Sequence, residues 1–298
     1  KNTGKGSAEV YGQVVTINQP EISTKTGFRL NDQNNFVLFA SSFYQDQESY
    51  FGAVKYAAKQ RNFYGNLQYE YNYGKNSVKT GLSFRHLNLD ENVSFTENTL
   101  QRTYAGNYLR QENIAGVFVE NTWKLFNDKL TWITGIRMDK HNQFGTILTP
   151  RTLLKYELTP NTTIRANVGR GWRTVNLFSE NIGVLVSSRD IIFEEQPEPE
   201  KAWNAGINLT QKFDGENISG FFSVDYYRTD FESQLFPDYD TDPRKVIIKN
   251  FTGKSASNTF QAELYLNFWE QFEFKTGYSF LDVYREIDEQ KVLLPFNP

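Results

Sequence analysis

Side chains that usually carry catalysis or bind metals are sparse in this sequence. The chain contains no cysteine, which excludes disulfides, thiolate zinc ligands and thiol nucleophiles. Its two histidines, His86 and His141, are far apart in the sequence, and neither belongs to a nucleophile motif. A phosphate-binding loop of the G-x-x-x-x-G-K-[ST] type is also missing. We therefore assign no catalytic residue, no metal site and no cofactor.

Two runs of carboxylates are the remaining candidates for chemistry. Asp238–Asp242 looks like the start of a calcium-binding loop, but Pro243 stands where that loop needs glycine and Lys249 where it needs glutamate. The glutamates of residues 194–200 include pairs of the kind that glycosidases use as acid and base. They stand in a proline-rich segment, where solvated surface carboxylates are the simpler interpretation. We expect that the protein is not an enzyme.

The composition of the chain is polar yet rich in aromatic residues. Of 298 residues, 39% are hydrophobic and 16% are aromatic, and the mean hydropathy is −0.59. Disorder would explain the polarity but not 25 Phe, 17 Tyr and 5 Trp. The net charge of −3 disfavours a nucleic-acid-binding protein, which normally carries a basic surplus. A transmembrane β-barrel, with a polar lumen and an apolar outer face, combines both properties, as does a soluble β-sandwich or β-propeller.

Apolar and polar residues alternate with a period of two along much of the chain. In residues 62–73, Phe63 and Leu67 share one face, and Asn66 and Gln68 share the other. The same pattern recurs in residues 78–85, 130–139, 164–169, 203–210, 260–268 and 272–280. We expect about twelve strands of roughly 10–14 residues, which is long enough to cross a bilayer. No segment has a clear helical pattern.

Short and long connections alternate between these strands. Turn residues mark short connections at residues 74–76, 127–128, 159–161, 214–216 and 269–271. Longer polar segments lie between them, at residues 87–111, 171–200, 229–246 and 283–298, with a shorter one at 142–145. An outer-membrane barrel has short turns on one side and long loops on the other, whereas a Greek-key sandwich has no reason to alternate in this way. We therefore expect an all-β fold, an antiparallel up-and-down transmembrane β-barrel.

The polar face of the predicted strands carries more charge than a dry protein core tolerates. Its charged residues include Lys79, Arg85, Arg137, Asp139, Arg151, Lys155, Arg165, Glu263 and Lys275. A lumen filled by water or by protein would accommodate them. We predict that six of them face this lumen: Arg85, Arg137, Asp139, Arg151, Arg165 and Glu263.

Residues 132–180 contain an ordered set of motifs. A Gly-x-Arg-x-Asp strand end is followed by a Pro-Arg strand start and by an arginine-containing strand that ends in Gly-x-Gly-Trp-Arg. The residues concerned are Gly135, Arg137, Asp139, Pro150, Arg151, Arg165, Gly169, Gly171, Trp172 and Arg173. This set resembles the mid-barrel signature of TonB-dependent receptors, and residues 197–206 resemble a strand entry of the same family. The family usually has proline two residues after the last arginine, where this chain has Val175.

The resemblance implies a barrel of roughly 22 strands in the outer membrane of a Gram-negative bacterium, with a plug domain inside it. Residues 1–298 would then be a partial barrel domain, with the plug and the barrel ends absent from this chain. The implied function is capture of a scarce nutrient, such as an iron–siderophore complex, cobalamin or another metal chelate, and its import with energy from TonB. The implied partners are outer-membrane lipid, the protein's own plug, the TonB complex acting through that plug, and the chelate.

The resemblance also suggests where the ligand and the plug make contact. Arg137, Arg151 and Arg165 would form a ladder on the lumen wall that pairs with carboxylates of the plug; the alternative is a generic solvated wall. Seven residues of the long connections are candidates for ligand contact: Arg173, Asn176, Phe178, Arg189, Tyr104, Tyr108 and Tyr239. The alternative for them is an ordinary loop surface and, for Tyr104 and Tyr108, a place among the aromatic residues of the barrel rim.

Two other functions fit parts of the pattern. A passive porin or adhesin barrel would have no plug. A soluble extracellular β-sheet protein that binds or hydrolyses carbohydrate would have to pack the alternating apolar faces as a core. Such a protein would purify without detergent, which distinguishes it from both the receptor barrel and the porin or adhesin barrel.

Overall fold

The computed structural model describes residues 5–7, 9–97, 102–180, 182–251, 253–287 and 289–293. Most of these residues form β-strands, and two short helices lie in one connection. The elements are β1 (Gln13–Asn18), β2 (Glu21–Arg29), β3 (Asn34–Phe51), β4 (Val54–Tyr73), β5 (Asn76–Phe95), β6 (Gly106–Leu125), β7 (Leu130–His141), β8 (Gly145–Thr159), β9 (Thr162–Arg173), α1 (Leu177–Glu180), α2 (Ile182–Val186), β10 (Asp190–Phe193), β11 (Glu200–Asp214), β12 (Ile218–Asp238), β13 (Lys245–Phe251), β14 (Ser255–Phe268), β15 (Phe272–Ile287) and β16 (Gln290–Leu293).

The strands follow one another around the sheet as an antiparallel meander. The order is β1-β3-β4-β5-β6-β7-β8-β9-β11-β12-β14-β15-β16, and β2 continues the edge position of β1 by pairing with β3. If β1 and β2 count as one interrupted strand and the short β10, β13 and β16 are left out, twelve strands form the wall within the described residues. The prediction of an all-β, antiparallel up-and-down sheet of about twelve strands is confirmed. Within the same ranges, no helix is long and apolar enough to span a membrane.

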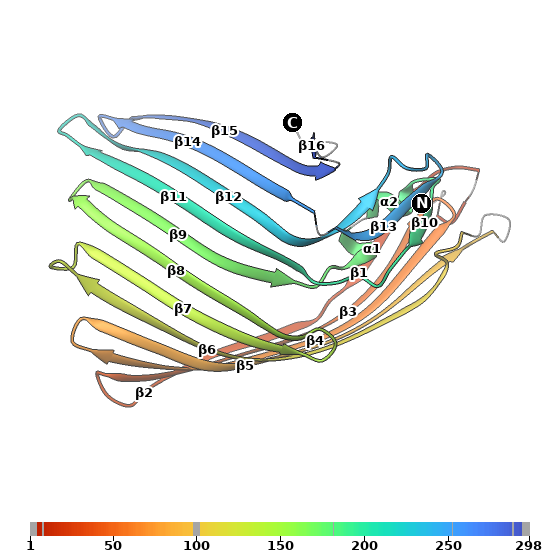
Figure 1. Cartoon of the computed structure of the whole chain (residues 1–298), viewed down its shortest axis with the longest axis horizontal. Coiled ribbons are helices and arrows are strands. Elements are labelled where there is room, and N and C mark those ends of the chain that lie inside the picture. The colour runs from red at the N-terminus through yellow and green to blue at the C-terminus, as the bar shows by residue number, and fades with distance from the viewer. Residues whose placement is uncertain are drawn as a thin grey trace.

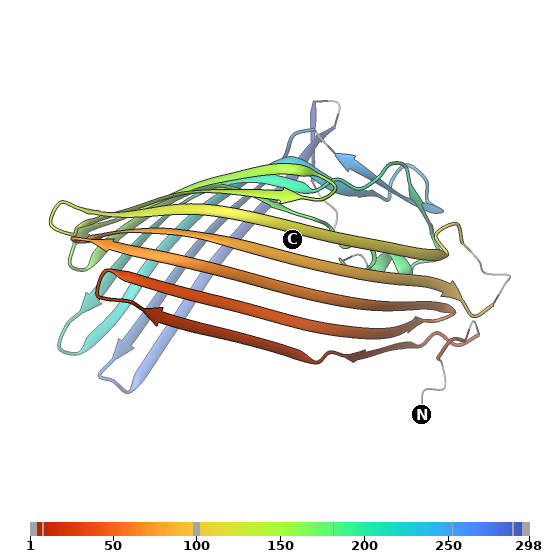
Figure 2. The ribbon, with the colours of Figure 1, turned by 90° about the horizontal axis from the view of Figure 1, so that it is seen from below.

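The sheet curves into an open trough: the two-residue β3–β4 turn lies at one end, but most of the tight turns lie at the other (Figure 1). The β4–β5 turn is an example: Gly74 has a φ of 60°, which glycine adopts without strain. The opposite end, near the start of β1 in Figure 1, holds α1, α2, β10 and β13. Seen from below, the early and the late strands lie on different sides of the curve (Figure 2). The trough therefore has an inner face, an outer face, a turn end and a loop end.

The two faces of the sheet differ as the alternation predicts. One row of paired residues on the outer face is apolar and more than one-third exposed: Leu67, Leu82, Val117 and Met138. The neighbouring row on the inner face is buried and polar or small: Asn66, Ser83, Gly116 and Asp139. An apolar belt of this kind is unfavourable in water and favourable against lipid acyl chains.

The strands run further toward the loop end than the sequence predicted. Most of the segment 87–111, interpreted as a long connection, belongs to β5 and β6, and much of 229–246 belongs to β12. The connection after β9 contains α1 and α2, although no helix was expected. The outer face of these extensions is mostly polar, and in β5 the apolar side chains Leu87, Leu89 and Val93 face inward, so the apolar outer row that marks a strand in lipid is lost while the backbone pairing continues. Of the predicted segment 283–298, residues 294–298 lie outside the described residues.

A buried apolar cluster occupies the loop end of the trough. The connection between β9 and β11 folds over the inner face of β4 and β5, where Phe178 and Leu185 pack among Tyr56, Leu87 and Val93. Side chains of β10 and β13 complete the cluster. Burying these side chains gives the connection a fixed place on the wall opposite the strands it joins.

Candidate functional site

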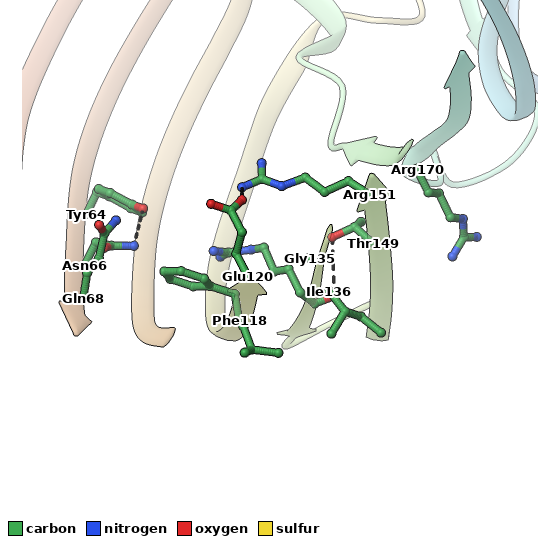
Figure 3. Close-up of a pocket in the computed structure, with 12 residues that line it drawn as sticks. Tyr64, Asn66, Gln68, Phe118, Glu120, Gly135, Ile136, Thr149, Arg151 and Arg170 are labelled. Atoms are coloured by element: carbon green, nitrogen blue, oxygen red, sulfur yellow. Dashed lines mark hydrogen bonds and ion pairs between the residues drawn. The ribbon is translucent and has the colours of Figure 1, made fainter. Parts of the chain in front are cut away.

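A cavity of about 320 Å³ lies against the inner wall of the trough. We call it the wall cavity. Figure 3 shows that Arg151 of β8 reaches toward Glu120 of β6, with which it forms an ion pair, while Tyr64 and Asn66 of β4 lie on the other side. The Asn66 amide donates a hydrogen bond of 3.1 Å to the Tyr64 hydroxyl. The wall cavity is therefore lined by charged and hydrogen-bonding groups from β4 and from the four consecutive strands β6 to β9.

Asp139 is the buried centre of a second set of contacts beside the wall cavity. Its carboxylate accepts hydrogen bonds from Arg137 Nε at 2.9 Å and from Trp172 Nε1 at 3.2 Å, and it is only 4% exposed. Arg137 also donates from Nη2 to the Ser83 hydroxyl at 2.6 Å. Gly116 lies directly beneath these groups, because a Cβ at that position would overlap the side chains of Asp139, Arg137 and Ser83. Both hydrogen bonds reach Oδ2, while Oδ1 has no hydrogen bond and is balanced by the charge of Arg137 Nη2 at 2.6 Å, which lowers the cost of burying the carboxylate.

The other residues predicted to face the lumen are spread around the same face. Arg165 donates from Nη1 to Asn208 Oδ1 at 3.0 Å, and Glu263 is paired with Lys275 at 2.9 Å. Arg85 of β5 is exposed. Strand alternation puts all of them on the side of Asp139, but only Arg137 and Arg151 line the wall cavity. Contact between these arginines and a plug stays a prediction.

A second cavity, of about 410 Å³, lies at the loop end, and we call it the mouth cavity. Its walls are the inner face of β6, the β7–β8 turn, and both ends of the β9–β11 connection, residues 174–177 and 196–199. Arg110 of β6 fastens the connection: it donates from Nη1 to the Val175 carbonyl at 2.6 Å and from Nη2 to the Asn176 side chain. The mouth cavity is thus framed by a rigid strand on one side and a fastened loop on the other.

Three of the predicted ligand-contact residues hold the loop end together. Arg173 forms ion pairs with Glu180 at 2.9 Å and Glu200 at 2.7 Å. The backbone N–H of Asn176 donates to Glu180 Oε1 at 2.9 Å. Arg189 donates to the Tyr239 carbonyl at 2.7 Å, and its guanidinium lies 5.7 Å from the centre of the Tyr239 ring. These contacts tie α1 to the start of β11 and the start of β10 to the end of β12.

Two of the predicted ligand-contact aromatics are buried in this structure. Phe178 is 2% exposed and Tyr104 is 1% exposed, because both belong to the apolar cluster. They offer no surface to a ligand in this arrangement. Tyr108 lies in β6 rather than in a loop, packs its ring 4.9 Å from that of Phe178, and lines the mouth cavity. Tyr239 is half-buried.

Several charged residues at the loop end were not identified from the sequence. Glu91, Arg110 and Glu112 stand in or beside the segment that was interpreted as a long connection, yet they lie on paired strands. Glu112 is fully buried, and its Oε1 atom lies 3.2 Å from Arg110 Nε. Charges two residues apart, at Arg110 and Glu112, are the one signal that could have placed them on a common strand face.

The acidic run that looked like the start of a calcium loop caps its own turn instead. Asp238 accepts hydrogen bonds from the backbone N–H groups of Asp240 and Thr241, and from the Thr241 hydroxyl at 2.8 Å. Lys249 of β13 adds an ion pair at 3.1 Å. Burial acts to raise the pKa of Asp238, but these hydrogen bonds outweigh it and hold the pKa well below its usual range. Over the described ranges, no group of three or more His, Cys, Asp or Glu side chains could hold a metal ion.

Comparisons with known proteins agree with this architecture. The family model described as "TonB dependent receptor-like, beta-barrel" matches residues 10–297. The siderophore receptor PirA from Pseudomonas aeruginosa has a TM-score of 0.62 and 13% identity, over 90% of this chain and 57% of PirA. The copper transporter OprC has a TM-score of 0.64 and 12% identity, over 98% of this chain and 49% of OprC. BauA, the ferric preacinetobactin receptor from Acinetobacter baumannii, has a TM-score of 0.65 and 10% identity, over 94% of this chain and 48% of BauA.

These similarities concern the fold, because the sequence identities are low. The chain spans about half the length of the solved structures that it matches. No curated protein sequence matches it.

Proposed function

Because the chain belongs to the TonB-dependent receptor β-barrel family, we propose that it forms barrel wall in an outer-membrane receptor that captures a scarce nutrient and imports it with energy delivered through TonB. The family match over residues 10–297 carries this proposal. The apolar outer row and the charged inner wall support it, since a receptor barrel needs lipid on one face and a polar interior on the other. Members of this family are transport receptors rather than enzymes.

The nutrient we propose is a metal chelate, such as an iron–siderophore complex, cobalamin or a related compound. Support comes from the similar structures, which are named a siderophore receptor, a copper transporter and a ferric preacinetobactin receptor. Arg173, Asn176, Arg189, Tyr108 and Tyr239 are the ligand-contact candidates with side chains in or around the loop end. Phe178 and Tyr104 would contribute by supporting the β9–β11 and β5–β6 connections, respectively, to which they belong.

The inner wall would hold the plug domain of the same receptor, encoded outside this chain. The Arg137 and Arg151 guanidinium groups line the wall cavity, and a planar guanidinium pairs well with a carboxylate in a two-pronged geometry. Arg85, Arg165, Asp139 and Glu263 would extend the contact along the wall. TonB would then act on the plug and not on this part of the protein.

Uptake of radiolabelled iron, supplied as a panel of chelates, tests the proposal in Gram-negative cells. We expect at least one chelate to enter only when the full-length protein, TonB and the proton gradient are all present. Uptake that needs the protein but neither TonB nor the gradient would identify a passive porin. Recovery of the full-length protein in the soluble fraction, without detergent, would contradict the membrane assignment itself.

A further inference from the structure

The mouth cavity has more acidic than basic groups on its walls. Glu91, Glu112 and Glu198 line it, and Arg110 is the single Lys or Arg among its described lining residues. Both terminal nitrogens of Arg110 donate to the β9–β11 connection, at the Val175 carbonyl and the Asn176 side chain. Its Nε atom faces Glu112. The guanidinium is therefore committed to neighbouring protein groups, and it is not available to neutralise a second carboxylate or to bind an anion.

Glu112 is buried with part of its hydrogen-bonding capacity unused. Its side chain is 1% exposed, and Oε2 accepts a hydrogen bond of 3.2 Å from the Thr174 hydroxyl. Oε1 has no hydrogen bond within the part of the chain that the structure describes. Arg110 Nε at 3.2 Å balances the charge of Oε1 without the alignment of a hydrogen bond. Such an acceptor gains free energy from any donor that reaches it.

Whereas Glu198 is exposed, Glu91 is the buried carboxyl group of the cavity for which the described structure shows no ion pair. It is 6% exposed, and the Tyr56 hydroxyl donates to its Oε1 at 2.7 Å. Burial raises the pKa of Glu91, because a carboxylate in this position has lost water without gaining a cation, although the Tyr56 hydroxyl and the charge of Arg110 act in the opposite direction. A cation placed in the cavity would stabilise the ionised form of Glu91.

The remaining walls of the mouth cavity combine the polar residues Asn107, Gln143, Thr174 and Gln196 with an apolar part. The Tyr108 and Phe144 rings, Leu177 and two prolines, Pro197 and Pro199, line it. Aromatic faces attract cations through their quadrupole and also bury apolar groups. A ligand that fits these walls has a positively charged donor at one end and an apolar body at the other.

We propose that the mouth cavity binds a small organic cation, an ammonium or guanidinium group on an apolar body, with Glu91 and Glu112 as its acceptors. This deepens the receptor function proposed above, on which it rests for its role in import: the cation would be a group carried by the imported chelate. The ligand class follows from the two buried carboxylates, the committed Arg110 and the aromatic and proline surfaces of the cavity.

Binding of 2-phenylethylamine to the full-length protein, purified in detergent, tests this assignment at neutral pH. The amine is cationic and fits the stated class, and 2-phenylethanol is its neutral counterpart of nearly the same shape. By titration calorimetry or ligand-observed NMR, we expect the amine to bind at least about tenfold more tightly than the alcohol, a difference of about 1.4 kcal/mol. Equal binding of both compounds, or of neither, would overturn the assignment.

Substitutions locate the binding within the protein. Glu91→Gln keeps the acceptor for Tyr56 while removing the charge, and we expect it to weaken amine binding about tenfold and leave the alcohol unchanged. Glu112→Gln should act in the same direction, and circular dichroism checks that each variant is folded. Glu216→Gln, the same change at an exposed turn at the other end of the trough, should have no effect. An unchanged affinity in Glu91→Gln would place the amine elsewhere and refute the proposal.

This binding experiment does not depend on import. If the amine fails to bind while TonB-dependent chelate uptake persists, only the cation site is wrong. If the amine binds but no chelate is taken up, the site stands and the receptor function fails.

Discussion

Gly116 stands where three polar side chains of the inner wall meet. A Cβ there would overlap Asp139, Arg137 and Ser83, so we expect Gly116→Ala to push the Arg137–Asp139 pair out of its hydrogen bonds. The expected loss is about 1–3 kcal/mol of unfolding free energy, the usual cost of forcing an extra carbon into a packed site. Chemical unfolding of the purified protein in detergent measures it.

Gly171→Ala is the matched control, since a Cβ at Gly171 would have no atom within 4 Å. It should change the unfolding free energy by less than about 0.5 kcal/mol. If the two alanine variants were equally stable, the Asp139 network would not depend on the space that Gly116 leaves.

Single residues were predictable from the sequence where charge and alternation coincide. Arg137 and Asp139 stand two apart on a clear strand and carry a recognisable motif, and the structure pairs them at 2.9 Å. Glu112 has only the charge two residues from Arg110 as a signal, because its part of β6 shows no apolar alternation and no motif. Its burial depends on the β9–β11 connection folding back over β6, a long-range contact that no local pattern encodes.

The strands were predictable where lipid imposes a period of two. The register of β4 to β7 follows the alternating residues, and the tight turns fall where turn residues were found. Beyond the apolar belt, lipid no longer requires an apolar outer face. The parts of β5, β6 and β12 nearest the loop end were therefore interpreted as connections, although their backbones stay paired. The helices α1 and α2 have four and five residues, too few to show a helical period.

The β9–β11 connection is held by apolar packing as well as by Arg110. Phe178 is its most central aromatic residue, with ring contacts to Tyr56, Tyr108 and Phe193. Truncating a buried phenylalanine costs about 3–5 kcal/mol in a core. We expect this loss to exceed the free energy that holds a short connection in place. We expect Phe178→Ala to release residues 177–193 while the wall stays folded, seen as faster hydrogen exchange confined to that segment.

The same truncation at an exposed position is the control, because it removes a phenylalanine ring without removing buried packing. Phe126, in the β6–β7 turn, is 72% exposed, so Phe126→Ala should leave exchange of residues 177–193 unchanged. Unaltered protection in Phe178→Ala would show that Arg110 and the ion pairs of Arg173 are enough to hold the connection.

At the scale of the whole molecule, the sheet separates two solvents. An exposed apolar row on one face and a buried polar row on the other are the inverse of a water-soluble sheet, which hides the apolar side. This arrangement favours the membrane barrel over a soluble carbohydrate-binding protein, because lipid makes the outer row favourable and water does not. The family match independently supports the same environment.

Arginine placed on either face of β4 tests this environment directly. Leu67 is 47% exposed on the outer face, and its neighbour Gln68 lines the wall cavity on the inner face. Leu67→Arg should make folding into lipid vesicles less favourable by about 2–4 kcal/mol, because it brings a charge into the acyl region. Gln68→Arg adds the same side chain to a polar interior and should cost little. In a soluble sheet the exposed Leu67 would tolerate arginine as well as or better than Gln68, so the order of the two variants discriminates the environments even if both fold less well than the parent.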